Sequence, residues 1–321
     1  MALVGSPIGK PWGRRLPVSV AGLYEDPLSL SFAPTGMNFA KNTGRLNNVD
    51  APSAETVPGL TYTRTGAATA WRSDGTLVEF APNVMRRTDA GVTIEGQRTN
   101  LLLNSMWAGG ASVTSWGNSA AGSDSASTTL PTVRARDFVA SASRPYMVET
   151  QAALAATTTH CLSVVVETIS ANIQAQQVLG HGGGLSGVTV TYPVCTANPS
   201  GGATGVIQPG RLHILLTTGA SAGSPQIRVG LGVSSNATGT ARLSLPQLEQ
   251  ASTASTPIIT TGAAATVGAD NLALVLSAGV TSYSAEYGDN LTATGPATPG
   301  PFDLATGRPW LNSALRRIIF L

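Results

Sequence analysis

Short apolar runs separated by turn-forming residues dominate the chain from about residue 60 onward. Clusters of Gly, Ser and Asn such as GHGGGLSG and GASAGSP lie between the runs. This spacing is typical of antiparallel sheets, whereas sustained helical periodicity is nearly absent. The strand-like runs of the longest such region are residues 145–150, 160–168, 172–179, 187–194, 204–208, 211–218, 225–233 and 240–248. We therefore expect an all-β protein in which residues 99–252 form an antiparallel β-sandwich or jelly roll.

The same alternation marks a smaller region, residues 59–98. Asp74-Gly75 lies between two apolar runs and predicts a hairpin, because Gly adopts the positive φ that tight hairpin turns require. Asp89-Ala90-Gly91 predicts a second turn. The region is thus expected to be a short β meander that is too thin to be stable alone.

The two ends of the chain lack such regularity. Residues 1–58 contain seven prolines and no sustained period of 2 or 3.6, which predicts an extended, irregular arm that docks on something else. Residues 253–321 read as a linker followed by a small hairpin region and a final apolar strand, RIIFL. These thin pieces need partners, so we expect the chain to be a homo-oligomer.

Composition narrows the classes of partner. Only 11% of the residues are charged, whereas about 25% is usual, so hydroxyls, amides and backbone must cover much of the surface. The net charge is +2 and the basic residues are scattered, which speaks against nucleic-acid binding. The longest apolar run, LALVLSAGV at 272–280, is about half the length of a membrane-spanning helix, so we expect no membrane insertion.

The two cysteines, Cys161 and Cys195, lie on apolar runs without the neighbouring ligands of a metal site. We interpret them as small core residues, and a disulfide between them stays open. Arginines such as Arg86 and Arg98 are expected to pair with Glu79, Glu95 or a neighbouring subunit, since guanidinium groups suit fixed carboxylate contacts.

Two short strings suggest an esterase: HGGG at 181–184 and the Gly-x-Ser-x-Gly string at 219–223. A nucleophile elbow needs a strand before it, a helix after it and a later histidine. All three histidines precede Ser221, and the string lies between two strand runs. We attribute both matches to the abundance of Gly and Ser.

Glycan cleavage needs two carboxylates about 5 to 10 Å apart across a groove. The acids of the expected sandwich are Asp124, Asp137, Glu149, Glu167 and Glu249. No pair of them is close in sequence. We therefore expect no enzyme activity, no cofactor and no metal.

Sugar binding is the ligand function that the residues leave open. Sugar-binding sandwiches present aromatic faces to pyranose rings, and the aromatics available here are Trp107, Trp116, Tyr146 and Tyr192. These four residues form our candidate glycan platform. The interpretation of them as ordinary core or interface aromatics carries more weight.

Three consecutive leucines stand out in EGQRTNLLLNS, residues 95–105. Leu101, Leu102 and Leu103 are too consecutive for a strand with one wet face, so we expect them to be covered on both sides. Arg98, Asn100 and Asn104 then serve as polar fasteners for the backbone. Together these residues are expected to form a structural joint between the meander and the sandwich.

The joint belongs to a segment, TYTRTGAATAWRSDGTLVEFAPNVMRRTDAGVTIEGQRTNLLLNS at 61–105, that resembles the "TRAS…Y…DG…A…PR…LIE…RTNLLLNS" pattern of bacteriophage and prophage virion proteins. A second segment, LPQLEQASTASTPIITTGAAATVGADNLAL at 245–274, resembles the exit pattern "QLE…ATSYIPTTGA…TRAAD" of the same proteins. In that family the two patterns bracket a jelly roll that is similar to carbohydrate-binding modules.

The resemblance implies a tail-fibre, tail-spike or head-fibre protein of the virion, assembled in the bacterial cytoplasm. It implies a homotrimer that contacts other virion proteins through the N-terminal arm and binds host surface polysaccharide through the jelly roll. A decoration or connector protein that binds no ligand is the first alternative. A spike that degrades glycan is a weaker one.

Overall fold

The computed structural model describes a β-rich chain. The described residues are 29–33, 36–41, 45–49, 60–107, 117–119, 123–140, 146–150, 154–170, 179–182, 185–190, 195–198, 202–205, 210–218, 226–230, 239–276, 278–287, 292–303 and 314–321. In these ranges every helix or strand is a β-strand, and the strands pair in antiparallel sheets. The prediction of an all-β fold is confirmed.

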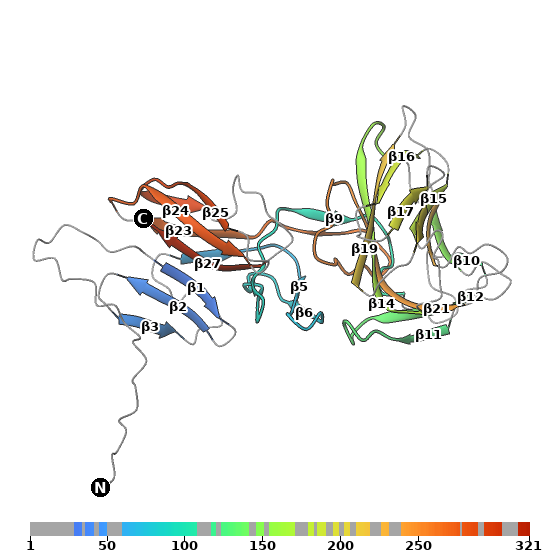
Figure 1. Cartoon of the computed structure of the whole chain (residues 1–321), viewed down its shortest axis with the longest axis horizontal. Coiled ribbons are helices and arrows are strands. Elements are labelled where there is room, and N and C mark those ends of the chain that lie inside the picture. Colours follow the sequence, from blue (N-terminus) through green and yellow to red (C-terminus); the bar gives the residue numbers. More distant parts are fainter. Residues whose placement is uncertain are drawn as a thin grey trace, which may run out of the picture.

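The molecule is elongated, with a sheet assembly at each end (Figure 1). At one end lie two six-stranded sheets, which we call the sandwich. At the other end the strands nearest both chain termini form a second assembly, which we call the base unit. Figure 1 shows the hairpin β5 (Ala68–Trp71) and β6 (Leu77–Phe80) between them.

The sandwich consists of two sheets through which the chain passes alternately. The first sheet has the order β11 (Ser123–Ala126), β12 (Arg134–Ala140), β21 (Gly239–Glu249), β14 (Thr159–Ile169), β19 (Gly210–Thr218) and β16 (Leu185–Val190). The second has the order β10 (Gly117–Ser119), β13 (Tyr146–Thr150), β20 (Gln226–Gly230), β15 (Leu179–Gly182), β18 (Gly202–Gly205) and β17 (Cys195–Asn198). Successive strands from β11 to β16 and from β18 to β21 largely alternate between the sheets, as a sandwich of the jelly-roll kind requires. The jelly-roll assignment itself stays a prediction.

Seven of the eight expected strand runs overlap strands β13, β14, β16 and β18 to β21. The run 172–179 lies outside the described residues except for Leu179, which begins β15. The agreement follows from local signals, because β-branched alternation and Gly-rich turns mark strand positions without any knowledge of their partners.

Strand β14 is buried on both faces. Leu162, Val164 and Val166 alternate with Cys161 and Val165, and all five are buried. Since successive side chains of a strand point to opposite faces, both sides of this sheet are covered. On one side Val165 belongs to a cluster with Leu77 of the β5–β6 hairpin, Leu130, Val133 and Leu245. The β5–β6 hairpin of the meander therefore helps to cover one face of this sheet.

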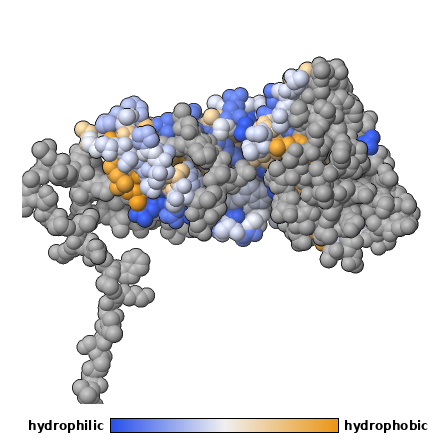
Figure 2. Space-filling model, turned by 45° about the horizontal axis from the view of Figure 1, so that its top comes forward, coloured by the Kyte–Doolittle hydropathy of each residue, from blue (hydrophilic) through white to orange (hydrophobic). Residues whose placement is uncertain are grey.

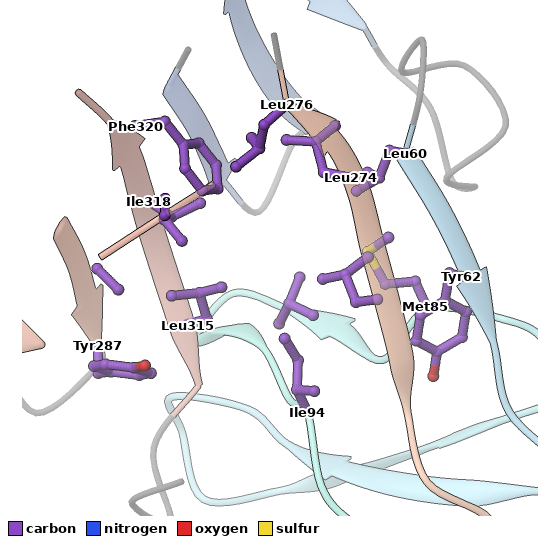
Figure 3. Close-up of a cluster of buried hydrophobic side chains, with 14 residues drawn as sticks. Leu60, Tyr62, Met85, Ile94, Leu274, Leu276, Tyr287, Leu315, Ile318 and Phe320 are labelled. Atoms are coloured by element: carbon purple, nitrogen blue, oxygen red, sulfur yellow. The ribbon is translucent and has the colours of Figure 1, made fainter. Parts of the chain in front are cut away.

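The base unit combines strands from distant parts of the sequence. One sheet has the order β25 (Thr292–Pro296), β24 (Ser282–Tyr287), β27 (Leu315–Phe320), β1 (Ser29–Ala33), β2 (Gly36–Lys41) and β3 (Arg45–Val49), with β8 (Gly91–Val92) beside β27 and β7 (Arg87–Thr88) beside β8. The other has the order β26 (Gly300–Asp303), β23 (Asn271–Leu276) and β4 (Leu60–Thr63). Figure 3 shows the apolar core of the unit, with Leu60 and Met85 from the meander beside Leu274, Ile318 and Phe320 from the C-terminal region.

This shared core corrects the expected boundary between a meander at 59–98 and a separate C-terminal region at 253–321. Strand β4 pairs with β23 from Leu60↔Leu274 to Thr63↔Asn271, so the two regions form one unit. Each thin piece finds its partner within the same chain. The small size of the meander and of the C-terminal region therefore does not imply an oligomer. The only remaining ground for expecting one is the resemblance to virion proteins.

The expected irregular arm at 1–58 also needs correction within residues 29–49. These residues form β1, β2 and β3, and β1 pairs with β27 from Ser29↔Ile319 to Ser31↔Arg317. The prolines do not prevent this arrangement because Pro27 and Pro34 lie just outside β1. Proline restricts a strand interior but is tolerated at its boundaries.

Both predicted turns of the meander are hairpins. Strands β5 and β6 pair from Ala68↔Phe80 to Trp71↔Leu77 around Asp74-Gly75, where Gly75 has a φ of 82°. Strands β7 and β8 pair through Thr88↔Gly91 around Asp89-Ala90. In the C-terminal region, where a small hairpin is expected, β24 and β25 pair antiparallel from Ser282↔Pro296 to Glu286↔Thr292.

Candidate functional site at the joint between the two units

The chain crosses between the base unit and the sandwich twice, along neighbouring paths. It leaves through β9 (Arg98–Asn100) and returns through β22 (Ala265–Val267). The two strands pair antiparallel, with Arg98 opposite Val267 and Asn100 opposite Ala265. We call residues 98–105 the entry segment and residues 245–270 the exit segment. The two segments together form the joint.

Asn100 fastens the entry segment to the exit segment. Its side-chain Nδ2 donates to the backbone oxygens of Ile258 at 2.9 Å and Pro246 at 3.4 Å. Its Oδ1 accepts from the backbone nitrogens of Leu248 at 3.0 Å and Leu102 at 3.1 Å. All four hydrogen-bonding positions of this fully buried amide are used, so the amide holds β21, the returning exit segment and its own segment together.

The three leucines differ in burial. Leu102 is fully buried, whereas Leu101 and Leu103 are partly buried. The backbone nitrogen of Leu101 donates to the oxygen of Leu248 at 2.8 Å, and that of Leu103 donates to Glu149 Oε1 at 2.9 Å. Cover on both sides is thus complete for the central leucine. Leu101 and Leu103 contribute backbone hydrogen bonds to the joint.

Further polar contacts extend the entry segment. Ser105 and Thr260 bond reciprocally, because each backbone nitrogen donates to the other's hydroxyl, at 2.7 and 2.9 Å. Asn104 is buried, and Arg98 is partly buried in β9. The candidate joint residues therefore lie together at one crossing.

A buried ion network adjoins the joint on the side of the base unit. The carboxylate of Asp270 accepts from Tyr62 Oη at 2.5 Å, from the backbone nitrogen of Glu95 at 2.7 Å, and closely from Arg86 Nη2. Arg64 Nη1 lies 3.5 Å from the same carboxylate and donates to Tyr62 Oη at 2.7 Å. The side chains of Arg64, Arg86 and Asp270 are at most 1% exposed.

Arg86 extends this network to the exit segment. Its Nη1 donates to Glu95 Oε2 at 2.8 Å, Thr256 Oγ1 at 2.7 Å and the backbone oxygen of Thr69 at 2.9 Å. Glu95 in turn accepts from the backbone nitrogen of Thr256 at 2.8 Å. The expected pairing of Arg86 with Glu95 is confirmed. The network thus connects the meander, the exit segment and the start of β23.

The charges of the network balance. Burial alone would lower the pKa of Arg86, but the carboxylates of Glu95 and Asp270 outweigh this effect and raise it. Burial alone would raise the pKa of Glu95, but the Arg86 guanidinium and hydrogen bonds from Thr256 lower it. Burial and the neighbouring Asp270 raise the pKa of Tyr62, which keeps its hydroxyl a proton donor. Two cations thus face two carboxylates, which is how buried charges are normally tolerated.

The candidate glycan platform is not assembled by the described residues. Trp107 is fully buried, and its ring meets that of Phe138 edge-on with centroids 6.3 Å apart. A ring in that position packs the core and cannot present a face to a sugar. Tyr146 lies in β13 opposite Gly230, but its side chain lies outside the described part. Trp116 and Tyr192 lie outside the described residues.

The five acids considered for glycan cleavage all accept hydrogen bonds from the protein. Asp124 and Asp137 form ion pairs with Arg134 and Arg242, each at 2.7 Å. Glu149, Glu167 and Glu249 accept from the backbone nitrogens of Leu103, Thr128 and Ser255, each at 2.9 Å. These contacts give each acid a structural function.

Acid sensitivity is the first testable consequence. Burial would raise the pKa of Glu167, but hydrogen bonds from Ser127, Ser244 and Thr128 lower it, as Arg86 does for Glu95. A lowered pKa in the folded state stabilises the fold above the unfolded value of about 4.3, and this contribution is lost as pH falls through the folded value. We expect the unfolding free energy from urea titrations to decrease as pH falls below about 4.5, where this contribution is lost.

The substitution Glu167→Gln should make that decrease shallower, because the amide does not titrate. The matched control Glu79→Gln makes the same acid-to-amide change at an exposed residue of β6 and shows how much of the difference is general to that change. A slope below pH 4.5 that is identical in wild type and Glu167→Gln would contradict this assignment.

A second prediction concerns Cys161. Its thiol is fully buried in β14, and burial raises its pKa to about 12. Since the thiolate is the reactive form, we expect Cys161 to react with a thiol-disulfide reagent only after denaturation. Spectroscopic thiol counting before and after addition of guanidinium, on a Cys195→Ser variant, checks this. Rapid labelling of the native variant would show that the site opens.

No protein-family model matches this chain, and a search of curated proteins finds no relative. Among the described residues, no helix has the length and apolarity needed to cross a membrane, and no three His, Cys, Asp or Glu side chains are grouped as for a metal ion.

The two sequence segments at 61–105 and 245–274 meet at the joint, where β9 pairs with β22. Asn100 and Leu102 come from the "RTNLLLNS" pattern, and Gln247, Glu249 and Asp270 come from the exit pattern. Sequence reasoning missed Arg64, Tyr62 and Asp270 as a group. A charged residue within an apolar, charge-poor segment is a sign that it is buried and paired. Nothing in the local sequence shows that residues about 200 positions apart form the pair.

Proposed function

We propose that this chain is a structural protein of a bacteriophage virion, a tail or head fibre that attaches the particle to host cell-surface glycan through its sandwich. The observation that carries the proposal is the coincidence of two virion-type sequence patterns with one buried joint. Residues of both patterns hydrogen-bond to each other there, as Asn100 does with Leu248 and Ile258. These contacts fix the architecture of the joint.

The arrangement suits a fibre. The sandwich lies at the far end of the molecule from the strands near both chain termini (Figure 1). A double crossing that is fixed by hydrogen bonds and buried ion pairs resists bending better than a single flexible linker. In Figure 2 the described surface over the middle of the molecule is mainly hydrophilic. Exposed polar loops at the end of a sandwich are where sandwich proteins commonly bind ligands.

A connector that binds no glycan is the second candidate, and the burial of Trp107 favours it. One of the four candidate platform aromatics belongs to the core. The candidate sugar-facing residues are then Trp116, Tyr146 and Tyr192. If these are also packed inside, the sandwich has no aromatic platform among the residues considered.

The deciding experiment measures binding of the purified chain to host cells and to their isolated surface polysaccharide. We expect saturable binding that Trp116→Ala and Tyr192→Ala weaken at least tenfold and that Trp71→Ala, a half-buried aromatic of the meander, does not. Absence of binding, while the protein is stoichiometric in particles, would favour the connector. Light scattering of the same samples tests the proposed trimer, and antibody labelling of particles locates the protein on the virion.

A further inference from the structure

The exit segment contains a buried group of side chains that the joint does not fully explain. Gln247 and Glu249 lie at the end of β21, and Ser255 lies six residues further on, where the chain folds back. Gln247 is 0%, Glu249 1% and Ser255 5% exposed. A hydroxyl, a carboxylate and a carboxamide thus meet in a place from which water is nearly excluded.

The Ser255 hydroxyl and the Glu249 carboxylate are arranged as a nucleophile and its general base. Ser255 Oγ donates to Glu249 Oε1 at 2.5 Å. The second carboxylate oxygen, Oε2, accepts from the backbone nitrogen of Ser255 at 2.9 Å, which fixes the orientation of the carboxylate. A hydroxyl becomes a useful nucleophile when a positioned base removes its proton as it attacks.

The Gln247 carboxamide is placed as the electrophile for the Ser255 hydroxyl. Gln247 Nε2 lies 3.1 Å from Ser255 Oγ, so the amide group adjoins the hydroxyl. Gln247 Oε1 accepts from the backbone nitrogen of Ile258 at 2.5 Å. A backbone N–H at the amide oxygen polarises the carbonyl and stabilises the negative charge that develops there during attack.

A cation lies beside this group. Arg211 of β19 donates from Nη1 to the backbone oxygen of Ser255 and from Nη2 to Ser163 Oγ at 2.8 Å. It holds the turn that carries Ser255 against the sheet and lies within electrostatic range of Glu249. The positions of the nucleophile and the base therefore depend on the folded sandwich.

We propose that Ser255 and Gln247 form an intramolecular ester crosslink with loss of ammonia. Ser255 turns about its Cα–Cβ bond to bring Oγ over the face of the Gln247 amide, whose oxygen stays on the N–H of Ile258, and Oγ attacks the amide carbon as Glu249 takes the hydroxyl proton. The tetrahedral oxygen is held by the N–H of Ile258. Glu249 then passes the proton to Nε2, the C–N bond breaks, and ammonia leaves. Nothing is oxidised or reduced, and Glu249 ends as it began.

The released ammonia is protonated and diluted in water, which drives the exchange of an amide for an ester. The product connects the end of β21 covalently to the returning exit segment, and closing a loop in this way stabilises a fold against unfolding. The crosslink does not depend on the proposed virion function, and its test requires no particle and no glycan.

The test is the mass of the purified full-length chain under denaturing conditions. We expect wild type to be lighter than its sequence mass by one ammonia. Ser255→Ala and Glu249→Gln should show their full sequence masses. Ser252→Ala, a matched change at an exposed serine of the same segment, should still show the loss.

Digestion localises the bond even if the variants fold poorly. A protease specific for glutamate cuts after Glu249, so unlinked wild-type chain yields separate peptides on the two sides. We expect these peptides to remain joined and to separate on treatment with hydroxylamine, which cleaves esters and leaves amides intact. A wild-type chain at full mass, or one whose peptides separate without hydroxylamine, would overturn the proposal and leave the three side chains as a hydrogen-bonded clamp.

Discussion

Replacing Asp270 by asparagine should lower the free energy of unfolding by about 3 to 5 kcal/mol, because it leaves two buried guanidinium groups without their shared carboxylate. Arg64 and Arg86 are at most 1% exposed, so water cannot replace the lost partner. The change also weakens the contacts with Tyr62 Oη and the backbone nitrogen of Glu95. Urea titrations of the full chain at pH 7 measure the loss.

A matched control and a double variant separate this cause from a general effect of the substitution. Asp74→Asn makes the same chemical change in the exposed β5–β6 turn, where it weakens only two hydrogen bonds from Thr76, and should cost clearly less. Combining Asp270→Asn with Arg86→Met should cost less than the sum of the single changes, since the second removes an unpaired charge. Strict additivity would mean that the two groups do not interact as the network requires.

The strands of the sandwich are predictable from sequence because their signals are local. HCLSVVVET in β14 is rich in apolar and β-branched residues, and a Gly-rich stretch follows before β16. Burial on both faces is also visible there as a loss of alternation. What the run cannot show is that the β5–β6 hairpin, far away in sequence, packs on one of its faces through Leu77.

The base unit was not predictable for the same reason. Its core joins Leu60 to Leu274 and Tyr62 to Asp270, contacts that span more than 200 residues. Each piece by itself has too few apolar residues to specify a partner. The prolines of the first 58 residues do restrict the local structure. Proline is found at the ends of strands as well as in segments without strands, so it did not exclude β1.

The joint was only partly predictable from the sequence. Three leucines flanked by asparagines reveal a place where backbone must be buried and fastened, and Asn100 fulfils that expectation with four hydrogen bonds. The partners of Asn100 depend on the path of the exit segment. The residues alone do not predict that path. The ion network beside it required two arginines and two acids to converge from four segments.

Replacing Leu102 by aspartate is the second change with a large expected effect. Leu102 is fully buried where the entry segment meets the sandwich, and its neighbours there are held by Asn100 and Leu248. A carboxylate at that position would be buried with no designed partner, so we expect the chain to lose its folded state and any assembly that depends on it. Leu102→Ala should fold but lose about 2 to 5 kcal/mol, the usual cost of a cavity.

The neighbouring leucines provide the control for this prediction. Leu103→Ala removes the same atoms from a partly buried position whose backbone nitrogen still donates to Glu149, so its loss in urea titrations should be clearly smaller. Circular dichroism and light scattering of Leu102→Asp report folding and assembly separately. A Leu102→Asp chain with wild-type melting and wild-type mass in solution would show that the leucine run is peripheral and that the polar contacts alone hold the crossing.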